Sequence, residues 1–552
     1  MTGTNVLIVG AGPVGLTLAI DLAWRGIDVT VVEARPPAAS PDPKCNHVAA
    51  RTMEIFRRLG LAEKVRNAGL PADYPHDISY RTTFTGEELT RIKIPCRRDR
   101  FTMKDGPDCN WPTPEPPHRI NQIFLEPILF EHATAQPRIR IVSRTSVEDV
   151  LVKDTCATVS LRDLEAGIVS RIDCRYLIGC DGARSIVRKA VGAELAGDAI
   201  VQQVQSTYIR AAKLIDLQRH ERAWGTGSIN PRRSGMVYAI DGRKRWLVHN
   251  YMKPGEGDFD EVDRDACIRT ILGVGTDFSY EVISKEDWYG RRLIANRFRD
   301  RCAFIAGDAA HIWVPYAGYG MNAGIADAMN LSWLLAAHLN GWAPSAILDA
   351  YEAERWPITS QVSRFAMSHA EAEIRRRGAV PEEIEDAGPS GERARREVGR
   401  LAYAINVQQY ACAGLNFGSY YDSSPIIAYD GSEHPAYTMD SYAPSTVPGC
   451  RTPHLWCADG RSLYDAMGPE FTLLRFDSAA ETAPLEAAAR ERGVPLRILD
   501  IQKPGLATTD GGGLVLSRPD QHVGWRGNTL PADPLALIDR VRGATIQAAT
   551  SD

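Results

Sequence analysis

The chain has 552 residues and carries 64 Lys and Arg against 69 Asp and Glu, a formal net charge of -5 at pH 7. A chain of this length predicts about two to four domains, and the absence of a strongly basic field argues against a nucleic-acid partner. No run of about 20 apolar residues occurs, so no membrane span is expected. The 11 cysteines form no CxxC pair and no Cys/His cluster, which argues against disulfides and against a metal site and favours a cytoplasmic protein.

The first elements have the pattern of a βαβ unit. Residues 5–9 (NVLIV) form an apolar β-branched run, which predicts a strand buried on both faces of a parallel sheet rather than a secretory signal. The glycine-rich segment 10–15 (GAGPVG) follows, then helical spacing over 16–25 and a second strand over 28–33. Glycines at the first turn of such a unit are typical of dinucleotide binding.

The three glycines and one acidic residue have separate functions in such a unit. Gly10 permits the tight turn out of the strand, Gly12 lets the backbone approach a pyrophosphate, and Gly15 allows the helix to pack closely on the strand. The carboxylate of Glu33, at the end of the second strand, can accept both hydroxyls of an adenosine ribose. This pattern predicts a bound dinucleotide but does not separate FAD from NAD.

The remaining elements are predicted in chain order from apolar spacing. The pattern indicates strands and long loops over 74–118, a helix over 119–132, short strands over 138–180, a β-rich block over 203–290 with a hairpin at 236–251, a strand over 301–306, and helices over 323–339 and 350–377. After about residue 441, strands at 471–476, 495–501 and 513–517 alternate with helices at 479–492 and 535–542, which indicates a compact α/β domain.

Several later motifs resemble those of one enzyme family. Residues 180–185 (CDGARS) resemble the DG motif of the FAD-dependent aromatic hydroxylases, the para-hydroxybenzoate hydroxylase group. Residues 307–311 (GDAAH), with the following segment to Asn322, resemble their GD motif, and 51–56 (RTMEIF) looks like their early helix. The segments 453–455, 459–464 and 518–527 (RPDQHVGWRG) look like the thioredoxin-like C-terminal domain of the phenol hydroxylase and polyketide hydroxylase branch.

The resemblance covers nearly the whole chain and implies its architecture. The fold class would be α/β, with a Rossmann-like FAD-binding domain, an inserted β-sheet substrate domain and a C-terminal thioredoxin-like α/β domain. We expect the FAD-binding domain in residues 1–75, 105–185 and 291–398, the substrate domain in 76–104 and 186–290, and the C-terminal domain in 430–552. Because the C-terminal domain has no CxxC, it is expected to be structural or to help association, without a dithiol redox role.

The resemblance also implies the reaction. The chain would be an FAD-dependent monooxygenase that uses NADPH or NADH as a transient co-substrate and O2, and hydroxylates a small aromatic, phenolic substrate through a flavin C4a-hydroperoxide. A Baeyer–Villiger-type or other oxygenation of a natural-product intermediate on the same scaffold stays open, and so does a non-catalytic flavin-binding protein. A flavin-dependent halogenase is disfavoured, because no WxWxxP-like run occurs. Association into a homo-oligomer is left open.

Three of the cofactor contacts that the resemblance implies involve the charged residues Lys44, Asp181 and Asp308. Lys44 stands where many relatives have an arginine. Lysine can still neutralise a phosphate, but it cannot bind the phosphate in the bidentate way that arginine can. Asp308 would accept a hydrogen bond from the ribityl chain, and Asp181 could contact cofactor or simply cap a helix. The full set expected to hold cofactor is Gly10, Gly12, Pro13, Val14, Glu33, Ala34, Arg35, Lys44, Arg51, Gln122, Val147, Asp181, Asp308, Gly320, Met321 and Asn322.

Substrate contacts are expected at Tyr238, His249, Tyr251 and Pro315. His249 and Tyr251 alternate onto one face of the 236–251 hairpin, but a strand presents two faces, and we favour packing on the outer face over contact with the flavin side. His311 in the GDAAH motif is expected to be structural, and the basic run 375–377 is interpreted as a solvated helix face.

Overall fold

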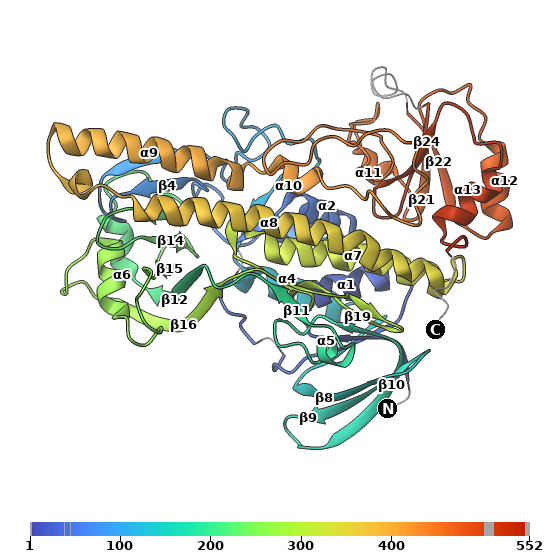
Figure 1. Ribbon diagram of the computed structural model, residues 1–552, viewed down its shortest axis with the longest axis horizontal. Coiled ribbons are helices and arrows are strands. Elements are labelled where there is room, and N and C mark those ends of the chain that lie inside the picture. Colours follow the sequence, from blue (N-terminus) through green and yellow to red (C-terminus); the bar gives the residue numbers. More distant parts are fainter. Residues whose placement is uncertain (1–2, 38, 45, 502–512, 547–552) are drawn as a thin grey trace.

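The computed structural model describes residues 3–37, 39–44, 46–501 and 513–546. Its first sheet has the strand order β18-β19-β10-β1-β2-β7, with β8 and β9 as an antiparallel extension of β10 (Figure 1). The strands β1, β2, β7, β10 and β19 run parallel. The bounds are β1 Thr4–Val9, β2 Val29–Val32, β7 Ile139–Val142, β8 Thr145–Val152, β9 Ala157–Asp163, β10 Val169–Gly179, β18 Arg299–Asp300 and β19 Ala303–Ile305.

The central strands are buried because they are apolar on both faces. Residues 6–9 of β1 and all of β2 are buried, as the β-branched runs predict. Helices pack against this sheet and against one another, with α1 in contact with both α4 and α7. The bounds are α1 Pro13–Trp24, α2 Ala50–Arg58, α3 Ala62–Asn67, α4 Gln122–Thr134, α5 Ile186–Ala190 and α7 Tyr319–Leu339.

A second, seven-stranded sheet has the order β16-β12-β15-β14-β13-β4-β5. The predicted hairpin is confirmed as β14 and β15, which pair antiparallel. Two smaller sheets, of order β11-β17-β20 and β3-β6, are also present. The bounds are β3 His47–Val48, β4 Ile78–Arg81, β5 Glu88–Ile92, β6 His118–Arg119, β11 Leu195–Gly197, β12 Gln202–Arg210, β13 Gly225–Ser228, β14 Gly235–Ala239, β15 Arg245–Tyr251, α6 Arg264–Leu272, β16 Glu281–Gly290, β17 Leu293–Ala295 and β20 His311–Ile312.

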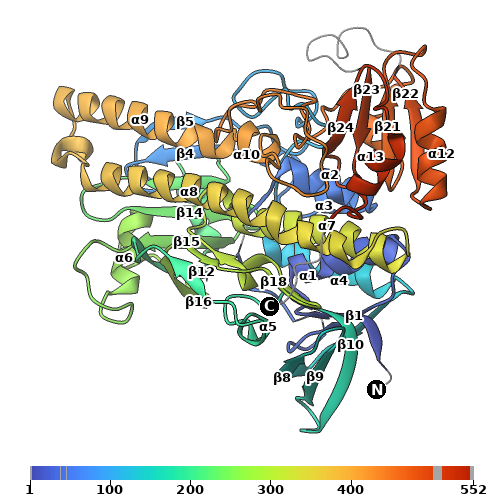
Figure 2. The ribbon, with the colours of Figure 1, turned by 45° about the vertical axis from the view of Figure 1, so that its right-hand side comes forward.

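The C-terminal part forms a four-stranded sheet of order β22-β21-β23-β24, in which β21 and β22 are parallel and β23 is antiparallel to both β21 and β24. One helix connects the parallel strands and another follows the antiparallel pair, the arrangement of a thioredoxin-like domain (Figure 2). The bounds are α11 Leu463–Ala466, β21 Phe471–Arg475, α12 Ala483–Glu491, β22 Leu496–Asp500, β23 Leu514–Ser517, β24 Val523–Gly527 and α13 Pro534–Val541.

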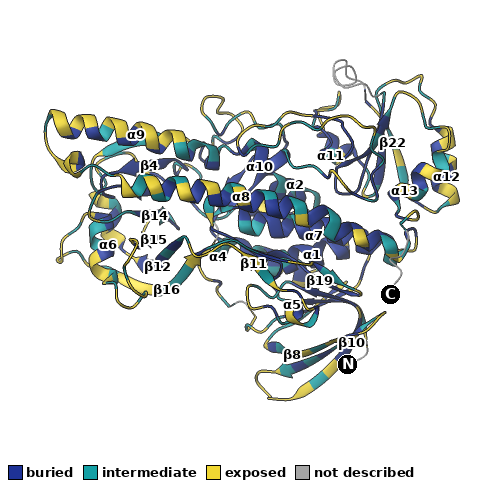
Figure 3. Ribbon diagram, viewed as in Figure 1, coloured by how far each residue is buried: buried dark blue, intermediate teal, exposed yellow. Residues whose placement is uncertain are grey.

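Long helices connect these parts. α8 (Ala350–Gly378) packs against α7 and runs on toward the second sheet, where it meets α9 (Pro389–Tyr410), and the short α10 (Ala413–Phe417) follows (Figures 1 and 2). α7 is buried along most of its length, whereas α9 exposes its outer side (Figure 3). Among the described helices, none is long and apolar enough to cross a membrane.

Two helix starts differ from the sequence prediction for local reasons. α4 begins at Gln122 and not at 119, because Asn121 caps it by accepting a hydrogen bond from the Ile123 amide, while residues 118–119 pair in β6. α7 begins at Tyr319, four residues earlier than predicted, because Gly318 takes a left-handed conformation (φ 61°) that turns the chain into the helix. The division of residues into domains remains our proposal.

Candidate functional site

The glycine turn between β1 and α1 has the shape that a pyrophosphate requires. A Cβ built on Gly10 (φ 101°) would lie 2.4 Å from the Cys180 carbonyl oxygen, and one on Gly15 would lie 2.0 Å from the Gly10 oxygen. Both positions are therefore closed by neighbouring backbone. A Cβ on Gly12, in contrast, would meet no described atom within 4 Å. The open space in front of Gly12, at the N-terminus of α1, fits the diphosphate of a dinucleotide.

Glu33 lies beside this turn as a structured carboxylate. It accepts hydrogen bonds from the Ala11 amide (2.7 Å) and from the amide and Nε of Arg35 (2.9 and 3.0 Å). Burial alone would raise the pKa of Glu33, but these hydrogen bonds outweigh it and hold the pKa below its ordinary value. The ionised carboxylate is suited to accept ribose hydroxyls. Arg35 in turn reaches Glu126 of α4 at 2.6 Å.

Lys44 and Gln122 are joined by a hydrogen bond between their backbones. The Gln122 amide donates to the Lys44 carbonyl (3.1 Å), and the Gln122 side chain donates to Glu126 (2.9 Å). The Lys44 ammonium forms an ion pair with Glu286 of β16. Lys44 therefore lies between the cofactor region and the second sheet, with its side chain about half exposed. A phosphate would compete with Glu286 for this ammonium.

The GD loop after β19 carries Asp308, and its fold depends on a buried charge network. Asp327 of α7 accepts from the Gly307 amide (3.2 Å), pairs with His311 (2.7 Å) and pairs with Arg355 of α8 (2.8 Å). His311 and Asp327 are both buried, so His311 has the structural role predicted for it. Asp308 itself is exposed, yet burial by the surrounding protein raises its pKa. The two observations agree if Asp308 lines a hollow, where a cofactor hydroxyl could meet it.

The first turn of α7 presents free backbone donors. A Cβ on Gly320 would meet no described atom within 4 Å, so this turn also borders open space. The first four N–H groups of a helix have no partner within the helix. The Asn322 side chain faces away from this space: it accepts from the Ala49 amide (2.9 Å) and donates to the Gly318 oxygen (2.7 Å). Asn322 could therefore contact a cofactor only through its backbone, and the contacts of residues 320–322 with a cofactor stay a prediction.

Of the predicted cofactor residues Pro13, Val14 and Ala34, Val14 connects the glycine turn to the GD loop. Pro13 is the first residue of α1, where its missing N–H costs nothing. Val14 packs against both glycines of the GD region, because a Cβ on Gly307 or Gly324 would lie 3.1 or 2.7 Å from its Cγ2. Ala34 directly follows Glu33 at the end of the second strand.

Asp181 of the DG motif is a helix-capping residue. One carboxylate oxygen accepts from the amides of Ile186 (2.8 Å) and Val187 (3.4 Å) at the start of α5. The other, Oδ1, has no hydrogen-bond partner among the described residues. The nearby Arg188 donates to the carbonyls of Ala183 (2.8 Å) and Ala309 (3.0 Å), so it joins the DG turn to the GD loop. The cap is established, and a further contact through Oδ1 stays a proposal.

Two expected cofactor residues are placed differently from the rest. The guanidinium of Arg51 pairs with Glu54 (2.8 Å) and contacts Asp520 and Gln521 of the C-terminal domain, so its contact with the cofactor stays a prediction. Arg51 is the second residue of α2, and sequence spacing could not show in which direction its side chain points. Val147 is partly buried on β8, whose first residue pairs with Glu33 through backbone, so its adenosine contact stays a prediction.

The expected substrate residues gather on one face of the second sheet. Directly opposed residues of antiparallel strands share a face, and the registers Met236↔His249, Val204↔Tyr251 and Val204↔Trp288 place the rings together. The His249 ring lies 5.8 Å from that of Tyr238 and 6.2 Å from that of Trp288. The face carries Glu286 as well, which pairs with Lys44, so it is turned toward the cofactor residues. This ion pair argues against the outer-face packing that we preferred, and contact of these residues with a substrate stays a prediction.

The ionisation states on this face follow from burial. Burial lowers the pKa of His249 to about 4, so the imidazole is neutral near pH 7, and its Nδ1 has no hydrogen-bond partner among the described residues. Burial also raises the pKa of Tyr238 well above its usual range, and its hydroxyl is hydrogen-bonded to Tyr410 of α9. The face therefore offers neutral hydrogen-bonding groups among aromatic rings.

The basic run on α8 supplies residues that sequence reasoning missed. Arg375 is exposed, but Arg376 and Arg377 are buried, so the interpretation of a solvated face holds for Arg375 alone. Arg377 lies over the Tyr251 ring (4.2 Å) and donates to the Tyr316 hydroxyl (3.0 Å). Tyr316 follows the exposed Pro315 in the loop before α7, so Arg377 joins that loop to the substrate face. No local sequence signal marks Arg377, because its partners are distant in the chain.

Comparison with known proteins agrees with this geometry. The family described as "FAD binding domain" matches residues 3–366, and "Aromatic-ring hydroxylase, C-terminal" matches residues 445–544. The FAD-dependent monooxygenase apdD of Emericella nidulans is 30% identical over 95% of this chain and 88% of its own length. Phenol 2-monooxygenase of Pseudomonas sp. (strain EST1001) is 29% identical over 98% of this chain and 93% of its own.

A solved structure matches the whole fold. The structure of the rebeccamycin biosynthetic enzyme RebC with reduced flavin is 32% identical, has a TM-score of 0.88, and covers 99% of this chain and 100% of that chain. The FAD-domain match includes the open space at Gly12, the carboxylate of Glu33 and the GD loop, all of which fit FAD. The chain therefore belongs to the FAD-dependent monooxygenases of the aromatic-ring hydroxylase family.

Proposed function

We propose that this chain hydroxylates a small phenolic substrate with NADPH or NADH and O2, and that the substrate lies between the cofactor and the aromatic face of the second sheet. The observation that carries the proposal is the grouping of Tyr238, His249 and Trp288 on the sheet face that is joined to the cofactor region through Lys44–Glu286. These residues are only partly buried, which supports a lined hollow over a closed core.

The bound flavin would supply the oxygen-transfer chemistry, and the protein would supply binding, orientation and a dry environment. Gly12 and the start of α1 would hold the pyrophosphate, Glu33 the ribose, and Asp308 the ribityl chain. The backbone amides of residues 320–322 would face the flavin's pyrimidine edge, where negative charge grows on reduction. The unpaired Oδ1 of Asp181 would serve the flavin or the nicotinamide.

His249 would orient the phenol and would not remove its proton completely. A phenol of ordinary pKa near 10 exceeds the folded pKa of His249, about 4, by about six units. Complete proton transfer would cost about 8 kcal/mol at about 1.4 kcal/mol per unit. A hydrogen bond from the phenol O–H to the unpaired Nδ1 costs no such transfer and increases electron density in the ring.

The glycines of β13 give the tyrosine rings room on this face. A Cβ on Gly225 would lie 3.1 Å from Tyr238, and one on Gly227 would lie 2.6 Å from Tyr80. Larger residues there would push the rings outward. Small residues opposite large rings therefore keep a flat aromatic wall, which suits a planar substrate.

The test is the rate of NAD(P)H oxidation by the FAD-loaded protein with a panel of phenols and a panel of ketones, with hydrogen peroxide measured in parallel. A phenol that raises the rate while peroxide stays low supports the proposal. Stimulation by ketones alone would favour a Baeyer–Villiger-type reaction, and stimulation by neither would favour a non-catalytic flavoprotein.

Variants locate the site. Tyr238→Phe is expected to raise the fraction of NAD(P)H lost as peroxide, because its hydroxyl fixes Tyr410. His249→Leu is expected to raise the KM for the phenol about tenfold, the effect of one hydrogen bond of about 1.4 kcal/mol. Tyr280→Phe is the matched control, since Tyr280 pairs with Asp265 outside this face. Equal behaviour of Tyr238→Phe and Tyr280→Phe would contradict the assignment.

A further inference from the structure

The turn between β23 and β24, residues 518–522, is inserted into the FAD-binding region. We call this segment the wedge. It reads RPDQH, yet Arg518, Asp520, Gln521 and His522 are all buried. The turn is tight: the Arg518 amide donates to the His522 carbonyl (2.8 Å), and Gln521 takes a positive φ of 63°. Burying a charged turn is costly unless every charge finds a partner, so the partners indicate what the wedge does.

Arg518 connects the wedge to α8 and α7. Its guanidinium forms two hydrogen bonds with Glu354 of α8, at 2.6 and 2.8 Å, and lies 5.0 Å from the Trp333 ring of α7. Glu354 also accepts a hydrogen bond from the side chain of Asn330 of α7, at 2.6 Å. One buried carboxylate thus joins the C-terminal domain to the middle of α7.

A second connection reaches the first turn of α7. Arg51 of α2 contacts Gln521 and donates to the carbonyl of Asp520. Its neighbour Thr52 donates to the Asn322 amide oxygen at 2.8 Å, and Asn322 holds the Gly318 carbonyl at 2.7 Å. The wedge therefore contacts Arg51 of α2, and the next residue, Thr52, is hydrogen-bonded to Asn322 in the first turn of α7.

α7 is closely packed at Gly324, one turn beyond the open space at Gly320. A Cβ on Gly324 would lie 2.7 Å from Val14 and 2.9 Å from the Cα of Gly307, so the helix already touches the glycine turn and the GD loop. At about 1.5 Å per residue, Asn330 is about 15 Å along the helix from Gly320. Close-packed interiors have low compressibility and transmit strain, so a shift of the buried α7 at Asn330 would reach its first turn.

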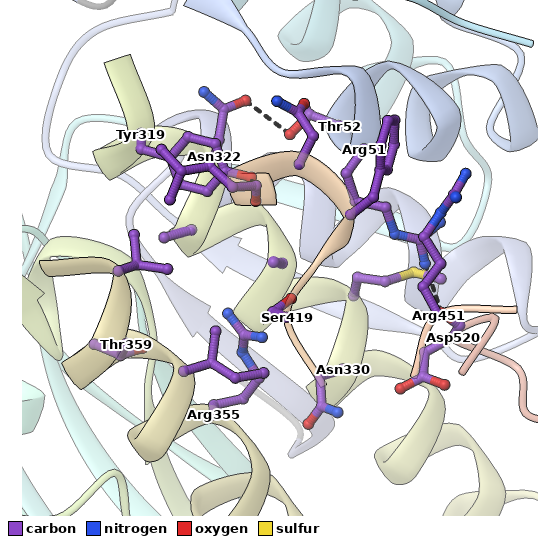
Figure 4. Close-up of a pocket in the computed structure, with 18 of the residues that line it drawn as sticks. Arg51, Thr52, Tyr319, Asn322, Asn330, Arg355, Thr359, Ser419, Arg451 and Asp520 are labelled. Carbon is purple, nitrogen blue, oxygen red and sulfur yellow. Dashed lines mark hydrogen bonds between the residues drawn. The ribbon is translucent and has the colours of Figure 1, made fainter. Parts of the chain in front are cut away.

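A cavity of about 60 Å³ lies beside the wedge. Figure 4 shows Asn330 of α7, Arg355 and Thr359 of α8 and Asp520 of the wedge on its wall. The Oδ1 of Asn330 and the hydroxyl of Thr359 have no partner among the described residues. A polar space of this size accommodates a few waters. The joint therefore depends on its ion pairs for position, because close packing is incomplete there.

We propose that the wedge is a positioning element for the flavin. Through Glu354–Asn330 and through Arg51–Thr52–Asn322, it holds α7 so that the backbone amides of the first turn stay directed at the flavin's pyrimidine edge. The C-terminal domain would thus favour the reduced, anionic flavin without redox groups of its own. This inference rests on the proposed placement of the flavin edge at residues 320–322, and it does not depend on which substrate is oxygenated.

The test compares the affinities for reduced and oxidised FAD, obtained from a redox titration of the holoprotein together with FAD binding to the apoprotein. Arg518→Met and Asn330→Ala are expected to lower the ratio of affinity for reduced over oxidised FAD at least threefold, and Arg518→Lys should restore part of it. Arg461→Met is the matched control, because Arg461 is exposed in the same domain and, among the described residues, its guanidinium forms an ion pair with Asp459 alone.

Asn330→Ala decides the matter if Arg518→Met fails to fold, because it leaves the Arg518–Glu354 pair in place. A folded Asn330→Ala protein whose ratio equals that of the wild type and of Arg461→Met would overturn the proposal and leave the domain a purely structural role. Phenol-stimulated NAD(P)H oxidation is measured separately, so a wrong substrate proposal would fail there while the flavin ratio still tests the wedge.

Discussion

Replacing Gly12 by alanine separates cofactor binding from folding. Gly12 has φ -76° and ψ 179°, which any residue adopts, and a Cβ there meets no described atom within 4 Å. Gly12 is the N-cap of α1, where alanine is less favourable than glycine by up to about 1 kcal/mol. The free energy of unfolding of the apoprotein should therefore fall by about 1 kcal/mol or less.

The same methyl group would occupy the space that the pyrophosphate needs. A hydrogen bond to a charged group is worth about 1.5–3 kcal/mol. Loss of one or two such bonds should weaken FAD binding by about tenfold to about 10⁴-fold. Gly10→Ala is the contrasting variant, because its Cβ would lie 2.4 Å from the Cys180 oxygen at a φ of 101°. It should destabilise the apoprotein itself.

The assay has two parts: denaturant unfolding of the apoprotein and fluorescence titration with FAD. A Gly12→Ala protein that binds FAD as tightly as the wild type would contradict the placement of the pyrophosphate against Gly12. If Gly12→Ala destabilised the apoprotein as much as Gly10→Ala, the space in front of Gly12 would not be open as described.

Two further predictions concern stability. Asp327→Asn should lower the free energy of unfolding by about 3–5 kcal/mol, because it leaves Arg355 buried without its counter-charge; a loss under about 1 kcal/mol in denaturant unfolding would contradict this. Burial, followed by the positive charge of Arg100, lowers the pKa of His76 to about 3, so the unfolded chain takes up a proton below about pH 6.5 that the folded protein refuses. The contribution of His76 to the free energy of unfolding is thus fully present above about pH 6.5 and falls toward pH 4. At pH 5 the loss from His76 alone is about 2 kcal/mol. In His76→Gln, the free energy of unfolding should therefore differ less between pH 7.5 and pH 5 than in the wild type.

Much of the fold could be predicted because its signals are local. Residues 6–9 (VLIV) are apolar and mostly β-branched, and they are buried in the parallel sheet as such a run predicts. Gly10, Gly12 and Gly15 were assigned three different functions from spacing alone, and the contacts at each position agree with that division. The hairpin at β14 and β15 was also predictable, because its turn and alternation lie within a short segment.

The substrate face could not be predicted, because a strand's two faces are equivalent until something packs on one of them. His249 and Tyr251 were correctly placed on a common face, but only the register with β16 and the Lys44–Glu286 pair show that this face is turned toward Lys44, which we predict to contact the cofactor. Arg377 was missed for a related reason. It is one of three adjacent arginines on a helix, and the helix's rotation against Tyr251 decides which of them is buried.

The helices and strands, the cofactor turn and the family resemblance were predictable from the sequence, since each depends on backbone conformation or residue size within a few positions. The directions of the long side chains became visible only in the folded chain. Arg51 has a reach that allows either the cofactor or the C-terminal domain, and it contacts Asp520, more than 450 residues later. Side-chain direction depends on partners brought near by folding, and for Arg51 these include the Asp520 carbonyl and the Gln521 side chain of the buried wedge, residues 518–522.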